Sequence, residues 1–251
     1  MWSRDRCAGD PAGGAKTRET RWTQQSGAAL IAVLVMLMLV STIGLCLALI
    51  TSLEPAIASA HEASLSCGYA AEAGLDIALH ELGAMADWNQ VLSGQVQSAI
   101  LQAGTDASLL LPDGTPADIE GLTNLASCGH AASCTSAELD AFTTDRPWGP
   151  NNPRWQVFGH ARLDQLGSFH LAPLPCEVIV WVGDDPAELD GDALRDSEPA
   201  PDGARRPGAG VITLRAEGFG IRAAHRVVTV TVSRSPGGDP RPRVVAWREV
   251  R

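Results

Sequence analysis

The sequence predicts an α+β fold in which a long N-terminal helix packs on an antiparallel β-sheet. An apolar run followed by helical periodicity occupies the first third of the 251-residue chain, and segments rich in β-branched residues follow Pro153. Short loops separate these segments, which favours antiparallel pairing. We expect four parts: a cytoplasmic leader (1–27), a transmembrane helix (28–53), an amphipathic helix (54–88) and an exported globular α+β domain (89–251).

The segment from Ala28 to Leu53 carries no charged side chain. As a helix, its core from Ala28 to Ile50 would span roughly 34 Å, which is enough to cross the hydrocarbon core of a membrane. Residues 1–27 hold five basic and three acidic side chains, whereas the whole chain has a net charge of −10. This asymmetry predicts a cytoplasmic N-terminus and an exported acidic body, and it argues against a nucleic-acid-binding surface.

Three interpretations of the apolar run are open. The first is a plain membrane anchor. The second is a signal peptide cleaved after Ala60, where Ala58-Ser59-Ala60 fits the small-residue pattern, although the run exceeds the roughly 7–15 residues of an ordinary signal-peptide core. The third, which we favour, is a leader cleaved after Gly27, because a peptidase at the cytoplasmic face needs a small, accessible residue where the membrane helix begins.

Three stretches carry a resemblance to a known family. The first is the entry from Arg21 through Val35 (RWTQQSGAALIAVLV), and the second is the passage from the apolar run through Glu54 into another helical segment. The third is Tyr69–Leu75 (YAAEAGL). Together they resemble the N-terminal region of the PilX-like minor pilins, over about a quarter of the chain.

The resemblance implies cleavage after Gly27 by a prepilin peptidase, methylation of the new Ala28 amine, and packing of the helix against other pilin or minor pilin subunits. It also implies a single-pass inner-membrane protein with a periplasmic body, which enters a type IV pilus or a type II secretion pseudopilus. Major pilins usually have Glu as the fifth residue of the mature chain. Ala32 stands there in this sequence, which favours a minor subunit.

The segment after Ala56 has the pattern of an amphipathic helix. Apolar residues recur at i, i+3 and i+7 along one face: Leu75, Ala78 and Leu82. A second face carries a row of polar side chains that we expect to be solvated rather than bound to a metal: Glu72, Asp76 and His80.

The exported domain is predicted to be helical in short pieces and then rich in strands. We expect a short helix within 91–101 and a helix that begins at Thr135 with capping residues. Alternating and β-branched runs predict the strands: 154–163, 177–183, 210–217, 224–233 and 243–250.

Four cysteines fall in the exported part, and an even number in an oxidising compartment indicates disulfides, with three possible pairings. We favour Cys128–Cys134 because this pair closes a short loop. Cys67–Cys176 would then tie the amphipathic helix to the sheet. The alternative is a metal site in which Cys128 and Cys134 act with His130.

An acidic stretch follows the strand 177–183 and is the best candidate for a ligand site. Its carboxylates suggest a calcium site, because Ca²⁺ takes six to eight oxygen ligands from flexible loops. The candidate ligands are Asp184, Asp185, Asp190, Asp192 and Asp196. The alternative is a solvated acidic loop with no ion.

No nucleotide-binding loop, zinc-binding helix or nucleophile elbow is recognisable in the sequence. His160, His170 and His225 have no obvious carboxylate partner nearby in the sequence. We therefore expect a minor pilin-like assembly subunit rather than an enzyme. The alternative is a membrane-anchored periplasmic binding module, with calcium as the one cofactor to consider.

Overall fold

The computed structural model describes residues 26–101, 108–162, 175–188, 190–197, 208–235 and 241–250. The chain divides into two compact units, residues 1–55 and residues 56–251, and the second is called the body below. Helix α1 (Ser26–Ala84) contributes to both units and contains Pro55 within its length. Its residues Gly27–Pro55 are called the apolar half, and Ala56–Ala84 the body half.

The body is built around a five-stranded antiparallel sheet whose spatial order follows the chain order, β3-β4-β5-β6-β7. Each strand is paired with the next one in sequence, as expected when short connections join consecutive strands. The α+β prediction is confirmed, and each predicted strand lies within two residues of an observed one: β3 (Gln156–Arg162), β4 (Glu177–Asp184), β5 (Val211–Phe219), β6 (His225–Ser233) and β7 (Arg243–Val250).

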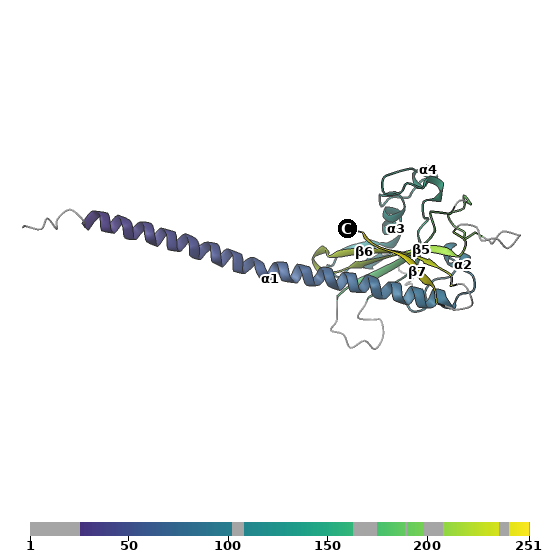
Figure 1. Cartoon of the computed structure of the whole chain (residues 1–251), viewed down its shortest axis with the longest axis horizontal. Coiled ribbons are helices and arrows are strands. Elements are labelled where there is room, and N and C mark those ends of the chain that lie inside the picture. The colour runs from purple at the N-terminus through teal and green to yellow at the C-terminus, as the bar shows by residue number, and fades with distance from the viewer. Residues whose placement is uncertain are drawn as a thin grey trace, which may run out of the picture. The chain divides into compact units, whose positions relative to one another are not determined.

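The body half of α1 packs on one face of this sheet (Figure 1). Buried residues of the helix and alternate residues of the three central strands form the main core. The helix backbone comes close to β4, since a Cβ on Gly74 would lie 2.7 Å from Val178 Cγ2. The core includes Ala70, Leu75, Ala78 and Leu82 from α1, and Val178, Val180, Leu214 and Val230 from the sheet.

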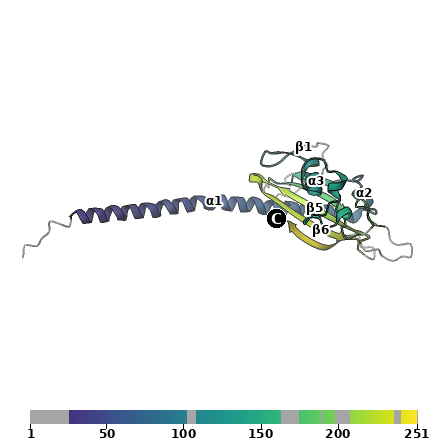
Figure 2. The ribbon, with the colours of Figure 1, turned by 90° about the horizontal axis from the view of Figure 1, so that it is seen from above.

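The opposite face of the sheet is covered by a smaller layer, visible in Figure 2 around α3. Trp181 lies at its centre, fully buried, and its indole N–H donates to Thr123 Oγ1 at 2.9 Å. This layer contains β1 (Ser108–Leu110), β2 (Pro116–Asp118) and α3 (Ile119–Cys128). Neither α3 nor the pairing of β1 with β2 was predicted from the sequence.

Two predicted helix bounds are corrected. The amphipathic helix ends at Ala84 rather than at residue 88, and the helix expected within 91–101 is the single turn α2 (Asn89–Leu92). Trp88 separates the two helices; its side chain is buried and donates to the Leu82 carbonyl at 3.0 Å. The remaining short elements are α4 (Ser136–Leu139), η1 (Gly149–Asn151) and η3 (Ile221–Ala223).

Candidate functional site

The apolar half of α1 is the largest candidate site. Every residue from Gly27 to Pro55 is exposed, including the large side chains of Met38 (74 %) and Leu39 (56 %). Within the described part of the chain, α1 is the one helix that is long and apolar enough to cross a membrane. An apolar surface on all sides of a helix indicates that its environment is lipid or another protein rather than water.

The predicted cleavage position lies at the beginning of this half. Gly27 is the second residue of α1, and Ala28 follows it within the same helix. A Cβ built on Gly27 would meet no atom within 4 Å. The fold of the described residues therefore places no steric demand on glycine at this position. The leader up to Gln25 lies outside the described residues.

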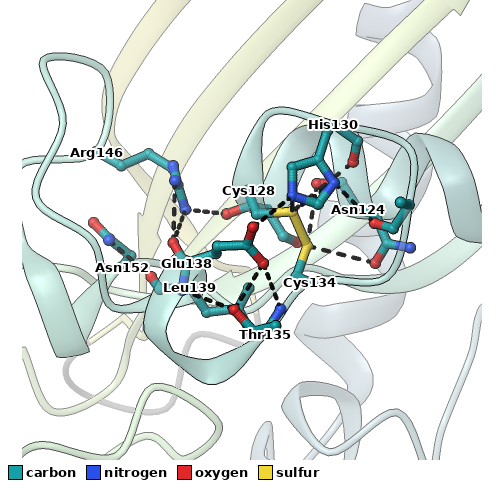
Figure 3. The surroundings of a disulfide bond; sticks show 11 residues. Asn124, Cys128, His130, Cys134, Thr135, Glu138, Leu139, Arg146 and Asn152 are labelled. Atoms are coloured by element: carbon teal, nitrogen blue, oxygen red, sulfur yellow. Dashed lines mark hydrogen bonds and ion pairs between the residues drawn. A yellow bond between two sulfur atoms is a disulfide. The ribbon is translucent and has the colours of Figure 1, made fainter.

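The short cysteine loop is closed by a disulfide between Cys128 and Cys134, whose Cα atoms are 6.0 Å apart (Figure 3). Cys128 ends α3, and the left-handed Gly129 (φ 90°) begins the loop. Because both sulfurs are bonded to each other, neither is a thiolate ligand, which removes the metal site considered for this loop with His130.

Helix α4 closes the same region through a capping box at Thr135, the helix start expected from sequence. Glu138 Oε2 accepts from the Thr135 N–H and hydroxyl, and Glu138 Oε1 lies 3.1 Å from His130 Nε2. These bonds, first those from Thr135, lower the pKa of Glu138 to about 2. Arg146 adds hydrogen bonds to the carbonyls of Ser127 and Glu138 (Figure 3). The loop is thus a compact structural unit.

The other two cysteines of the body face each other as thiols. Cys67 of α1 and Cys176, the residue before β4, have their sulfurs 3.8 Å apart and are both buried. A disulfide between these two residues was predicted from the sequence. The structure places them side by side, without a disulfide bond.

The acidic stretch divides into two sets of side chains. Asp185 and Asp192 are turn residues that accept from the backbone N–H groups of Ala187 and Leu194, and Asp190 accepts in the same way from the Asp192 N–H at 2.9 Å. The other three predicted residues, Asp184, Asp190 and Asp196, gather with one carboxylate that the sequence analysis did not select, Glu188. These four residues are called the carboxylate group below.

Hydrogen bonds position the carboxylate group between α2, β4 and β5. Ser197 donates from its backbone N–H to Glu188 Oε1 at 3.1 Å and from its hydroxyl to Asp190 Oδ2 at 3.1 Å. Asp196 Oδ1 accepts from the N–H of Gly210 at 2.6 Å, and the Asp196 N–H donates to Asn89 Oδ1 at 2.8 Å.

Two oxygens of the group, Asp184 Oδ1 and Glu188 Oε2, have no hydrogen-bond partner although both side chains are almost fully buried. Burial, with the charge of Glu188, raises the pKa of Asp184 to about 8. Burial also raises the pKa values of Glu188 and Asp196. Asp184 is therefore largely protonated at neutral pH unless a cation replaces the proton.

Across the described ranges, no three His, Cys, Asp or Glu side chains are placed so that they would hold a metal ion. The carboxylate group thus consists of three buried acids, Asp184, Glu188 and Asp196, and the exposed Asp190. The polar row of α1 faces outward, since Glu72, Asp76 and His80 are all exposed.

Two histidines have carboxylate partners that the sequence analysis missed. His160 Nδ1 lies 3.3 Å from Glu177 Oε1, and His225 Nε2 lies 2.7 Å from Glu217 Oε2. His225 and Glu217 come from neighbouring strands, so the antiparallel register of β5 and β6 creates the pair. Burial works to raise the pKa of Glu217, but the His225 hydrogen bond and nearby Arg215 outweigh it and lower the pKa. His170 lies outside the described residues.

Comparisons with protein-family models, with curated proteins and with solved structures found no match to this chain.

Proposed function

We propose that this protein is a minor pilin-like subunit that takes part in the assembly of a type IV pilus or a type II secretion pseudopilus. One observation carries the proposal: a single helix has a fully exposed half whose residues 28–53 carry no charge, and a second half packed on an antiparallel sheet. This is the arrangement that the resemblance to PilX-like minor pilins implies. Ala32 at the fifth position of the expected mature chain favours a minor subunit.

In this proposal, the apolar half first holds the protein in the inner membrane, with the body in the periplasm. A prepilin peptidase then cleaves after Gly27, and the helix that begins at Ala28 packs against the helices of other pilin subunits. A lipid-facing surface and a helix-packing surface have the same requirement, because both need apolar side chains without unpaired charge. The body half keeps the globular part attached to the helix during this transfer.

The substitution Gly27→Val tests the proposal. We expect the unprocessed chain to accumulate in the membrane, because a β-branched side chain should not fit a peptidase site shaped for glycine. The fold offers no competing explanation, since a Cβ at Gly27 meets open space. Gly44→Val is the matched control, because Gly44 lies in the same helix and also faces open space. Maturation that proceeds equally in both variants would contradict the proposal.

The alternative function, a membrane-anchored binding module, is favoured by one observation: the unpartnered oxygens of Asp184 and Glu188. A divalent cation would neutralise them and order the loop. If so, millimolar Ca²⁺ should raise the melting temperature of the protein, since a ligand of the folded state stabilises it. Asp190→Ala should abolish the rise, and Asp185→Ala, outside the carboxylate group, should leave it intact. A melting temperature indifferent to Ca²⁺ would reject this alternative.

A further inference from the structure

Cys67 and Cys176 form the most complete site that the proposed function does not use. The two sulfurs lie 3.8 Å apart, although the two positions are 109 residues apart in the chain. Exposed fractions of 0 % and 2 % show that both side chains are enclosed in the core. The site therefore joins α1 to the beginning of β4, inside the body.

The surrounding backbone is shaped to admit these sulfurs. A Cβ on Gly218 of β5 would lie 2.1 Å from the Cys67 carbonyl oxygen. A Cβ on Gly220 would lie 2.5 Å from the Cys67 sulfur and 3.7 Å from the Cys176 sulfur. Side chains at these two positions would displace the helix or the sulfur, so both glycines are needed for the approach of the two thiols.

The two thiols are chemically unequal. The contact with Cys176, together with burial, raises the pKa of Cys67. The hydrogen bond from Cys67 in turn lowers the pKa of Cys176. Because the thiolate is the nucleophile in thiol–disulfide exchange, Cys176 is the residue suited to react first when the contact opens only enough to admit an oxidant and the Cys67 hydrogen bond persists.

We propose that Cys67 and Cys176 form a disulfide in the mature protein and that this bond fastens α1 to the sheet. The Cys176 thiolate attacks one sulfur of an oxidant disulfide and releases the other sulfur as a thiolate. The Cys67 thiolate then attacks the Cys176 sulfur of the mixed disulfide, which forms the new bond and releases the second oxidant thiol. The two protein thiols lose two protons and two electrons, and the oxidant disulfide is reduced to two thiols.

The oxidant belongs to a stated class: a protein disulfide oxidoreductase in the exported compartment, or glutathione disulfide in a test tube. Only the first rests on the proposed function, because it requires export of the body. Burial of both sulfurs means that exchange takes place before α1 packs on the sheet or during opening of this contact. Once formed, the bond is protected from reductants by the same burial.

The position of the bond suggests its role. Ala63 is the first buried residue of α1, and Cys67 follows it by one helical turn. Tension that reaches the body along α1 would therefore act on the segment from Ala63 to Cys67 before it acts on the later turns of the helix. Near it, Arg226 of β6 donates to Ser64 Oγ at 2.7 Å. The disulfide adds a covalent attachment at the place where the helix would begin to peel from the sheet.

The test uses the full chain in detergent, refolded from the reduced, denatured state with glutathione disulfide. Free thiols are then alkylated under denaturing, non-reducing conditions and the peptides are mapped by mass spectrometry. We expect a peptide pair joined through Cys67 and Cys176 in addition to the Cys128–Cys134 bond. Alkylation of both Cys67 and Cys176 in protein that keeps the Cys128–Cys134 bond would overturn the proposal.

A second measurement isolates the effect on stability. In a Cys128→Ala/Cys134→Ala variant, oxidation should raise the melting temperature by roughly 5–10 °C over the reduced form, as expected for a long-loop disulfide. The Cys67→Ala/Cys176→Ala variant should lack this component, and its near-ultraviolet circular dichroism reports whether it folds. Equal melting temperatures for the oxidised and reduced forms of the first variant would contradict the proposed attachment.

This outcome is distinguishable from that of the proposed function. Refolding with glutathione disulfide does not depend on cleavage at Gly27. A bond that forms in a protein never processed at Gly27 would uphold the disulfide and reject the pilin proposal. Cleavage at Gly27 in a protein that lacks the Cys67–Cys176 bond would uphold the pilin proposal and reject the disulfide.

Discussion

The two halves of α1 have opposite surroundings although they belong to one continuous helix. The apolar half has no charged residue between Ala28 and Leu53 and no buried residue. The body half carries charged residues on its exposed side, such as Glu72, and buries small residues such as Ala70 against the sheet. The partner of the body half is the sheet of the same molecule, whereas the apolar half has no partner among the described residues, and we propose that membrane lipid or other subunits surround it.

The body half also differs from the apolar half in that its backbone comes very close to the sheet on which it packs. Alanine and glycine let the helix backbone come near β4 and β5, whereas the apolar half presents Leu, Ile, Met and Val to its surroundings. Gly218 is the extreme case, with backbone of α1 where its Cβ would be. Stability of the body should therefore depend on small residues, and insertion of the apolar half on hydrophobicity alone.

The largest effect is expected from Gly218→Val. The side chain would collide with the Cys67 carbonyl, which belongs to the backbone and can move only if α1 shifts. We expect a loss of about 4 kcal/mol or more in the free energy of unfolding, measured by denaturant titration. Gly68→Ala is the control, because Gly68 lies beside Cys67 but faces open space. A stable Gly218→Val variant would show that α1 does not pack closely on β5.

The second effect is a dependence of stability on pH. We expect it in the body, which contains buried carboxyl groups, and not in the apolar half. Asp184 has a pKa raised to about 8, so the folded body keeps a proton that the unfolded chain releases near its ordinary pKa of 3.8. Its stabilising contribution is full at low pH and is lost as the pH rises through this window, by about 1.4 kcal/mol per unit.

Unfolding free energies measured between pH 5 and pH 8 check this expectation. The stability of the wild type should fall with rising pH, and Asp184→Asn should reduce the slope because the amide does not titrate. Glu188 and Asp196, whose pKa values are also raised by burial, should account for the slope that remains. Glu138 has a pKa lowered to about 2, so its contribution changes below this range and does not interfere. An unchanged slope in Asp184→Asn would show that Asp184 is ionised in the folded state.

The third prediction addresses the apolar half. Leu39→Arg places a charge near the middle of the run, which should cost about 3 kcal/mol of insertion free energy. We expect a smaller fraction of the protein to resist extraction from membranes at alkaline pH, while the melting temperature of the body stays constant. Leu39→Ala serves as the control for the lost side chain. Equal extraction of the two variants would argue against membrane insertion of this half.

The smallest effect compares one substitution in both halves. Gly68→Ala should raise the unfolding free energy by roughly 0.5–1 kcal/mol, because alanine favours a helix and a Cβ there meets open space. Gly44→Ala, in the apolar half, should leave the same measurement unchanged. A gain from both variants would indicate that the apolar half unfolds together with the body.

The sequence predicted the architecture well where residue patterns were strong. The apolar run from Ala28 predicted a helix, and the alternation in 224–233 predicted a strand. The strand 243–250 was predicted with its observed bounds. Helix α3 was missed because residues 89–153 have few apolar residues in a regular pattern, and its packing under Trp181 depends on a distant strand.

The candidate sites were predictable in part. Closeness in sequence identified the acidic stretch, but Glu188 was overlooked because its burial depends on how the loop packs on the rest of the body. Strand register, which a single sequence does not specify, creates the contact of Glu217 with His225. The approach of Cys67 to Cys176 was predicted by elimination, and only the structure shows that Gly218 and Gly220 make room for it.

The N-terminal residue of the mature protein tests the central claim most directly. Terminal sequencing or top-down mass spectrometry of protein isolated from the membrane gives this residue without any substitution. The account predicts a chain that begins at Ala28, with a methyl group on its amine. A chain that retains residues 1–27, or one that begins at His61, would contradict it.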